Sequence, residues 1–130
     1  MREDEMGTLV VDAAVQIHRE LGSGLLEVVY EVILTHELRG RGLQVARQVS
    51  VPIIYRGVKF DEGFRIDLIV ESEVVIELKC VEALHNAHKK QLLTYLRLSD
   101  NRLGYLLNFG APLMKDGIIR VVNRLSEPLI

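Results

Sequence analysis

The 130-residue sequence has no tryptophan, a single cysteine and only three prolines, and these scarcities limit what the protein can be. The one cysteine, Cys80, cannot form an internal disulfide, which excludes a disulfide-stapled secreted scaffold. The acidic start, residues 1–5, lacks the basic and apolar regions of a signal peptide. We therefore expect a cytoplasmic protein.

Long hydrophobic runs and a one-sided charge are also missing. No apolar stretch approaches the roughly 20 residues that a membrane-spanning helix needs, so we expect no insertion into a membrane. Sixteen basic against eighteen acidic residues give a net charge of −2, and nucleic-acid binding would therefore need a local basic patch. A hydrophobic fraction of 48% and this chain length suit a single domain over residues 1–130.

Apolar periodicity predicts an alternation of helices and strands. The expected elements are helices over 9–21 and 25–38, strands over 45–55, about 64–70 and 74–81, a helix over 83–98, and strands over 103–109 and 118–122. The short reversal at 71–73 requires an antiparallel hairpin, whereas the helix after the third strand permits a parallel crossover. The sequence thus predicts an α/β fold with a mixed central sheet flanked by helices.

Charged residues inside two of these apolar strands are the main functional clue. Alternation places Glu77 and Lys79 on one face of their strand. If the hairpin turns at Ser72, Asp67 lies opposite Glu77 and Arg65 lies opposite Lys79, with the paired side chains on the same face. The two carboxylates would then be roughly 5 Å apart at Cβ and could hold one hard divalent cation. The lysine could orient a water or stabilise charge on a phosphate.

A structural explanation of these charges competes with the functional one. A short D…E-x-K pattern is common by chance, and a Glu77–Lys79 or Asp67–Lys79 ion pair at a sheet edge would also account for it. A zinc site is a weaker alternative, because His85 and His88 lack the further ligands of a closed tetrahedral site.

Three motifs together resemble a known family. The segment Gly24-Leu25-Leu26-Glu27-Val28-Val29-Tyr30 matches the signature of the GxxExxY proteins, and the D…E-x-K strands with the following Gln91-Leu92-Leu93-Thr94-Tyr95 resemble the same group. This family is similar to a branch of the PD-(D/E)xK nuclease superfamily, and the resemblance spans about residues 8–122. It implies a restriction-endonuclease-like fold and a nuclease that hydrolyses phosphodiester bonds with Mg²⁺ or Mn²⁺ as cofactor.

The resemblance also implies residue roles. It assigns catalytic positions to Glu27, Asp67, Glu77, Lys79 and Gln91. The three carboxylates would be the metal ligands, with Glu77 also polarising the water, and Gln91 would support the site from the crossover helix. The position before Asp67 is Ile66, where the superfamily's name has proline.

The expected partner is nucleic acid, with DNA as the first candidate. Substrate contacts would come from four residues of the crossover helix: His88, Lys89, Lys90 and Tyr95. Non-functional explanations remain open for three of the motif residues. Glu27 could be a solvated helix residue, and Tyr30 and Tyr95 could serve only in packing. A non-catalytic nucleic-acid- or protein-binding module that keeps the nuclease fold is the alternative function, and self-association as a homo-oligomer is a third reading.

Overall fold

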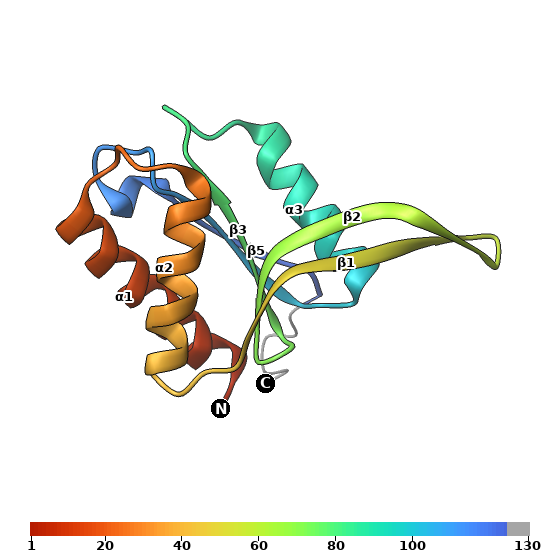
Figure 1. The fold of residues 1–130 in the computed structure, drawn as a ribbon. Helices are drawn as coiled ribbons and strands as arrows, with labels where there is room; N and C mark the ends of the chain where they lie inside the picture. Colours follow the sequence, from red (N-terminus) through yellow and green to blue (C-terminus); the bar gives the residue numbers. More distant parts are fainter. Residues whose placement is uncertain (125–130) are drawn as a thin grey trace.

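The structure is a computed structural model and describes residues 1–124. Three α-helices, one short 3₁₀ helix and five strands follow one another along these residues (Figure 1). In chain order they are α1 (Glu3–Leu21), α2 (Glu27–Gly40), β1 (Val45–Tyr55), β2 (Val58–Val70), β3 (Val74–Lys79), α3 (Asn86–Ser99), β4 (Leu103–Asn108), η1 (Met114–Gly117) and β5 (Ile118–Val122).

The five strands form one sheet in the order β1-β2-β3-β4-β5. Neighbours are antiparallel except β3 and β4, which α3 connects as a parallel crossover. Helices α1 and α2 lie on one side of the sheet and α3 on the other (Figure 1). The predicted fold class, an α/β fold with a mixed central sheet flanked by helices, is confirmed.

Strand alternation divides the buried apolar side chains into two cores. Val74, Ile76 and Leu78 of β3 join the core beneath α1 and α2, whereas Val75 joins the core beneath α3. This is the face assignment that alternation predicts for β3. Glu77 and Lys79, which share the parity of Val75, therefore belong to the α3 side of the sheet.

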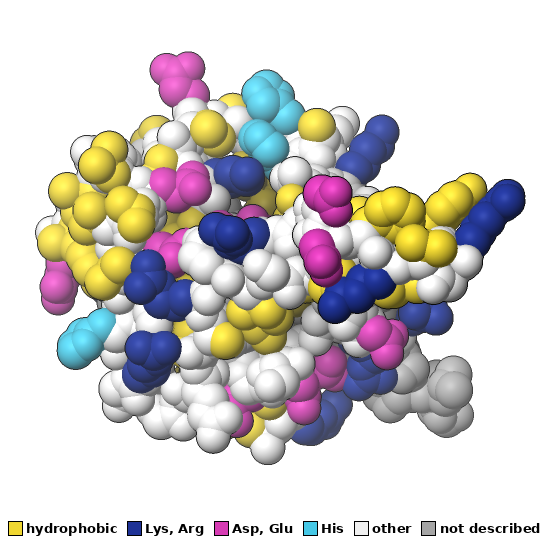
Figure 2. All heavy atoms as spheres, turned by 45° about the vertical axis from the view of Figure 1, so that its right-hand side comes forward, with side chains coloured by type: hydrophobic (Ala, Val, Ile, Leu, Met, Phe, Trp, Pro, Cys, Tyr) yellow, Lys and Arg dark blue, Asp and Glu magenta, His cyan; other side chains and the backbone are white. Residues whose placement is uncertain are grey.

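The β1–β2 hairpin extends beyond the body of the protein as an arm (Figure 1). Its turn residues Arg56 and Gly57 both have positive φ, 51° and 79°, as in the two-residue turns that suit twisted hairpins. Strand β2 consequently begins at Val58 and not near residue 64 as predicted. The first half of β2, residues 58–63, is exposed, and its apolar alternation covers only Val58 and Phe60 before a charged and glycine-containing stretch. This alternation is too short to predict a strand. The arm carries hydrophobic side chains with basic ones beyond them, and these apolar residues are solvent-exposed (Figure 2): Ile54, Tyr55, Val58 and Phe60.

Other element boundaries differ from the predictions by a few residues. Helix α1 begins at Glu3 and not at residue 9, because its acidic first turn suits the helix N-terminus and is anchored by two ion pairs, Glu3–Arg102 and Asp4–Arg120. Helix α3 begins three residues later than predicted, at Asn86. Within residues 1–124, none of the helices combines the length and apolar character that crossing a bilayer requires.

Candidate active site

The register between β2 and β3 places Asp67 next to Glu77. The paired residues are Leu68 with Ile76, Ile69 with Val75, and Val70 with Val74, which is the predicted register. Backbone pairing ends at Leu68 and Ile76, so neither the predicted pair of Asp67 with Glu77 nor that of Arg65 with Lys79 belongs to the backbone ladder. Beyond this point the strands part, and side chains take over the contacts between them.

Two side chain-to-backbone hydrogen bonds hold the strands where they part. The Asp67 N–H donates to Glu77 Oε1 over 3.1 Å, and the Leu78 N–H donates to Asp67 Oδ2 over 2.9 Å. Each carboxylate thus replaces a backbone acceptor of the sheet. The two acidic side chains are thereby fixed on neighbouring strands, and neither is free to swing out into solvent.

The side chains of β2 switch from one face of the sheet to the other at Asp67, which explains why β2 and β3 part there. Leu68 and Val70 belong to the core beneath α1 and α2, whereas Ile66 and Phe64, which have the same parity, belong to the core beneath α3. The hairpin therefore twists sharply at Asp67 and folds over α3. Asp67 lies at the transition, half-buried, where both layers of helices approach the sheet.

Burial dominates the electrostatics of Glu77. Glu77 is only 6% exposed. This burial, and after it repulsion from the Asp67 carboxylate, raises the pKa of Glu77 to about 8. Hydrogen bonding with the Asp67 carboxyl also favours the protonated form, whereas the Asp67 backbone N–H and the Lys79 charge oppose it. Glu77 is therefore mostly protonated at neutral pH unless a further positive charge favours its ionised form.

Lys79 lies near this pair without a direct ion pair. Within residues 1–124 it forms no salt bridge, so the predicted alternative of a Glu77–Lys79 or Asp67–Lys79 ion pair is not formed. Its positive charge nevertheless lowers the pKa of Glu77 and, after burial, the pKa of His88. The half-buried ammonium is therefore close to the acidic pair and still available to a ligand.

Asn108 fixes the backbone after Lys79. Its Nδ2 donates to the Val81 carbonyl over 2.9 Å, and its Oδ1 accepts from the Val81 N–H over 3.0 Å. The Phe109 N–H donates to the Lys79 carbonyl over 2.9 Å. The buried Asn108 side chain therefore continues the β3–β4 pairing past the strand end and holds the lysine in register. The sequence reading did not single out this asparagine.

Glu27 approaches the site from the first turn of α2. Burial, followed by the Asp67 charge, raises the pKa of Glu27, whereas Lys79 and a hydrogen bond with the Cys80 backbone lower it. Within the described part of the chain, however, no three His, Cys, Asp or Glu side chains come close enough together to hold a metal ion. The structure thus shows an acidic pair with a third carboxylate nearby, and not a closed cage of three ligands.

Gln48 and Glu31 contact the site and were not predicted to belong to it. Gln48 Nε2 donates to Glu31 Oε1 over 2.7 Å and to Asp67 Oδ1 over 3.3 Å. Glu31 lies one helical turn after Glu27 on the same face of α2, so its place near the site could have been predicted from this spacing. Nothing in the periodicity of β1 pointed to Gln48.

The residues of α3 contribute unequally. Tyr95 is half-buried and stacks on Phe64 with ring centroids 4.1 Å apart, and its pKa is raised by burial and then by the charges of Glu77 and Asp67. Its phenol therefore lies near the acidic pair, but one ring face is already covered. Gln91 is exposed and makes no side-chain hydrogen bond within residues 1–124, so the structure does not bring it into contact with the pair.

Three of the four predicted substrate contacts lie in the first turns of α3. His88 is half-buried, and its Nδ1 accepts from the His85 N–H over 3.2 Å. Lys89 and Lys90 are exposed. On the face in Figure 2, basic side chains are interspersed with acidic and uncharged ones and form no continuous patch.

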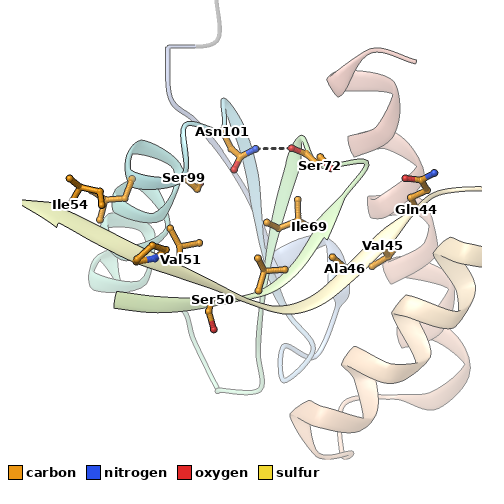
Figure 3. Close-up of a pocket in the computed structure, with 13 residues that line it drawn as sticks. Gln44, Val45, Ala46, Ser50, Val51, Ile54, Ile69, Ser72, Ser99 and Asn101 are labelled. Atoms are coloured by element: carbon orange, nitrogen blue, oxygen red, sulfur yellow. Dashed lines mark hydrogen bonds between the residues drawn. The ribbon is translucent and has the colours of Figure 1, made fainter. Parts of the chain in front are cut away.

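A hollow of about 690 Å³ lies apart from the acidic pair, between β1 and the end of α3 (Figure 3). Apolar side chains such as Val51 and Ile69 form much of its lining, and the Asn101 amide donates to the Ser72 carbonyl at its edge. No residue predicted for the site lines it. The acidic pair is therefore separate from this hollow.

Comparison with known proteins places the chain in a family. A family model described as the PD-(D/E)XK nuclease superfamily matches residues 4–121 of the chain. The match covers α1 through most of β5 and includes every residue predicted for the site. No curated protein gave a significant match.

Proposed function

This chain belongs to the PD-(D/E)XK nuclease superfamily, and from that premise we propose that it is a metal-dependent nuclease that hydrolyses phosphodiester bonds in nucleic acid. Its α/β fold is restriction-endonuclease-like. The observation that carries the proposal is the reciprocal locking of Asp67 and Glu77 at the point where β2 and β3 part, with Lys79 nearby. DNA is the first substrate to test.

The donor set fits a hard divalent cation. Carboxylate oxygens are the ligands that Mg²⁺ and Mn²⁺ prefer. Burial and then the Asp67 charge raise the pKa of Glu77, and an ion held there would favour the ionised carboxylate. We assign Asp67 and Glu77 as the principal ligands, with Glu27 as a third. When bound, the ion would supply Lewis-acid chemistry and lower the pKa of a coordinated water.

The remaining steps fall to side chains of this chain. Glu77 Oε1 accepts from the Asp67 N–H, which fixes this carboxylate, and in its ionised form the carboxylate can polarise the attacking water as well as hold the ion. The Lys79 ammonium can donate hydrogen bonds to a phosphate oxygen as negative charge develops there. Tyr95, His88, Lys89 and Lys90 are assigned to contacts with the substrate, and Gln91 to support of the site.

Two finer proposals accompany this function. The segment from Gly24 to Tyr30 supports membership of the GxxExxY branch of the superfamily. The family match over residues 4–121, together with one continuous sheet, supports a single domain over residues 1–130.

Cleavage assays test the proposal directly. Purified protein is incubated with end-labelled single- and double-stranded DNA and RNA in the presence of Mg²⁺ or Mn²⁺. We expect cleavage that disappears in Asp67→Asn and Glu77→Gln and persists in Glu73→Gln, a matched control in the exposed β2–β3 turn. Undiminished cleavage by Asp67→Asn would rule out this site.

A non-catalytic binding module is the second candidate. The observation that favours it is that the described residues contain no group of three side chains placed to hold a metal. Calorimetric titration with Mg²⁺ and Mn²⁺ discriminates between the two functions. Absence of metal binding, together with retained binding of labelled DNA, would favour the module over the nuclease.

A further inference from the structure

We propose that Gln48 is a positioning residue that fixes the orientation of the Asp67 carboxylate, and that the buried Glu31 holds Gln48 in place. The proposal rests on the proposed nuclease function, because it concerns the same acidic pair. It adds a second layer of residues, from β1 and α2, to the site on β2 and β3.

The first argument is the register of the sheet. Arg47 pairs with Leu68 and Val49 pairs with Ile66, so Gln48 is the residue of β1 that lies opposite Asp67. Gln48 and Asp67 are therefore cross-strand neighbours on β1 and β2, and the Gln48 amide lies against the Asp67 carboxylate.

The second argument is that both oxygens of Asp67 have a donor, each from a different strand. Oδ2 accepts from the Leu78 N–H of β3, and Oδ1 accepts from Gln48 Nε2 of β1. The torsion that rotates a carboxylate plane is intrinsically broad, so one donor alone would leave this plane loosely defined. Donors on both sides fix it, and thereby fix the oxygen lone pairs offered to an ion.

The third argument is that Gln48 is itself held. Glu31 is only 4% exposed, and its Oε1 accepts from Gln48 Nε2 over 2.7 Å. Its Oε2 accepts from Arg47 Nε and Nη2 over 3.1 and 3.0 Å, which compensates the buried charge. Helix α2 also carries Glu27, the proposed third ligand. The network therefore connects the helix of Glu27 to the strand of Asp67.

The fourth argument is the backbone of Gln48. Its φ is 51°, in the left-handed region that glycine and asparagine adopt more readily than glutamine does. Glutamine thus occupies a position that its backbone preference does not favour. Conformations of this kind persist where a side chain is needed in one place, and here that place is between Glu31 and Asp67.

The key variant is Gln48→Asn, which separates backbone from side-chain effects. Asparagine suits the left-handed backbone, but its amide is one methylene shorter and cannot reach both carboxylates. We expect an unchanged or higher melting temperature, a Mn²⁺ affinity at least fivefold weaker by calorimetry, and a kcat at least tenfold lower with KM for DNA within about twofold. Gln48→Glu, which keeps the length but replaces the donor by a negative charge, should lower kcat further. Ser50→Ala, an exposed change two residues along β1, is the matched control.

A readout without metal or substrate keeps this proposal separate from the nuclease proposal. Gln44 and Gln48 are both exposed, but within residues 1–124 only the Gln48 side-chain amide of the two is hydrogen-bonded. In the apo protein, that amide should therefore exchange its hydrogens more slowly in NMR experiments than the Gln44 amide, and Asp67→Asn should shift its resonance. Equally fast exchange of both amides, or wild-type Mn²⁺ affinity and kcat in Gln48→Asn, would overturn the positioning role. Slow exchange of the Gln48 amide in a protein without metal binding or cleavage would overturn the nuclease function alone.

Discussion

The backbone N–H of Asp67 donates to the carboxylate of Glu77, and the Asp67 carboxylate accepts from the residue that follows Glu77. This exchange replaces backbone pairing between β2 and β3 at the point where the strands part. It keeps two like charges close together in a largely buried setting, and the raised pKa of Glu77 is the consequence. The properties of the site follow from how that charge is compensated.

Glu77 makes the stability of the protein depend on pH. Its folded pKa of about 8 lies above the ordinary value of 4.5, so the folded state binds the extra proton between these pH values. The contribution is fully present below pH 4.5 and is lost as pH rises through 8. We expect Glu77→Gln to remove a decline of roughly 2–4 kcal/mol in the free energy of unfolding between pH 5 and 8. Urea denaturation of both proteins across this range measures the difference. Parallel pH profiles would show that Glu77 titrates normally.

Divalent ions should stabilise the protein more at high pH than at low pH. Binding to the carboxylates competes with protonation of Glu77, which is protonated at pH 6 and largely ionised at pH 9. Thermal denaturation with 10 mM Mg²⁺, about 100 times an assumed dissociation constant, should show a stabilisation of about 2.7 kcal/mol at pH 9. The stabilisation should be much smaller at pH 6 and absent in Asp67→Asn. An equal effect at both pH values would place the ion elsewhere.

Lys79 should contribute to turnover and not to folding. It makes no salt bridge within residues 1–124, so Lys79→Met leaves no carboxylate without a direct partner. We expect kcat to fall by about 100- to 1,000-fold, the usual effect of removing one donor to a developing charge. Lys115→Met, an exposed change on η1, is the control. A wild-type kcat in Lys79→Met would show that Lys79 has no role in turnover.

The two phenylalanines of β2 should differ sharply in their effect on stability. Phe64 is half-buried and stacks on Tyr95, whereas Phe60 lies on the arm and is 44% exposed. We expect Phe64→Ala to cost about 2–4 kcal/mol of unfolding free energy and Phe60→Ala less than about 1 kcal/mol. Chemical denaturation measures both. Equal losses of unfolding free energy in the two variants would mean that Phe60 is buried in solution, with the arm packed against another surface.

Tyr30 should act through folding alone. Its fully buried ring stacks on Phe109, and its hydroxyl donates to the Gly22 carbonyl over 2.5 Å and accepts from the Leu25 N–H over 3.1 Å. Tyr30→Phe leaves these loop groups without a partner and should cost about 1–3 kcal/mol of stability. The kcat measured well below the melting temperature should stay within twofold of wild type. A larger loss of kcat would give this motif tyrosine a role in the site.

Most of the fold was predictable because it depends on local patterns. Helical and strand periodicities located the three α-helices and the five strands but not the 3₁₀ helix η1, and the turn at Ser72 set the β2–β3 register that brings Asp67 beside Glu77. Boundaries were missed where local pattern was weak, above all in the first half of β2, which carries charged residues and glycine over no core. Those residues become a strand only because β1 pairs with them.

The sequence by itself determined which charges share a face of β3, because side-chain alternation is a property of the strand backbone. Only the tertiary structure decided how those charges are compensated. The twist of the hairpin at Asp67, the left-handed Gln48 and the Arg47–Glu31 pair depend on packing between a helix and strands far apart in the chain. The pKa of Glu77 has the same origin, because burial and the distance to a neighbouring charge exist only once the chain has folded.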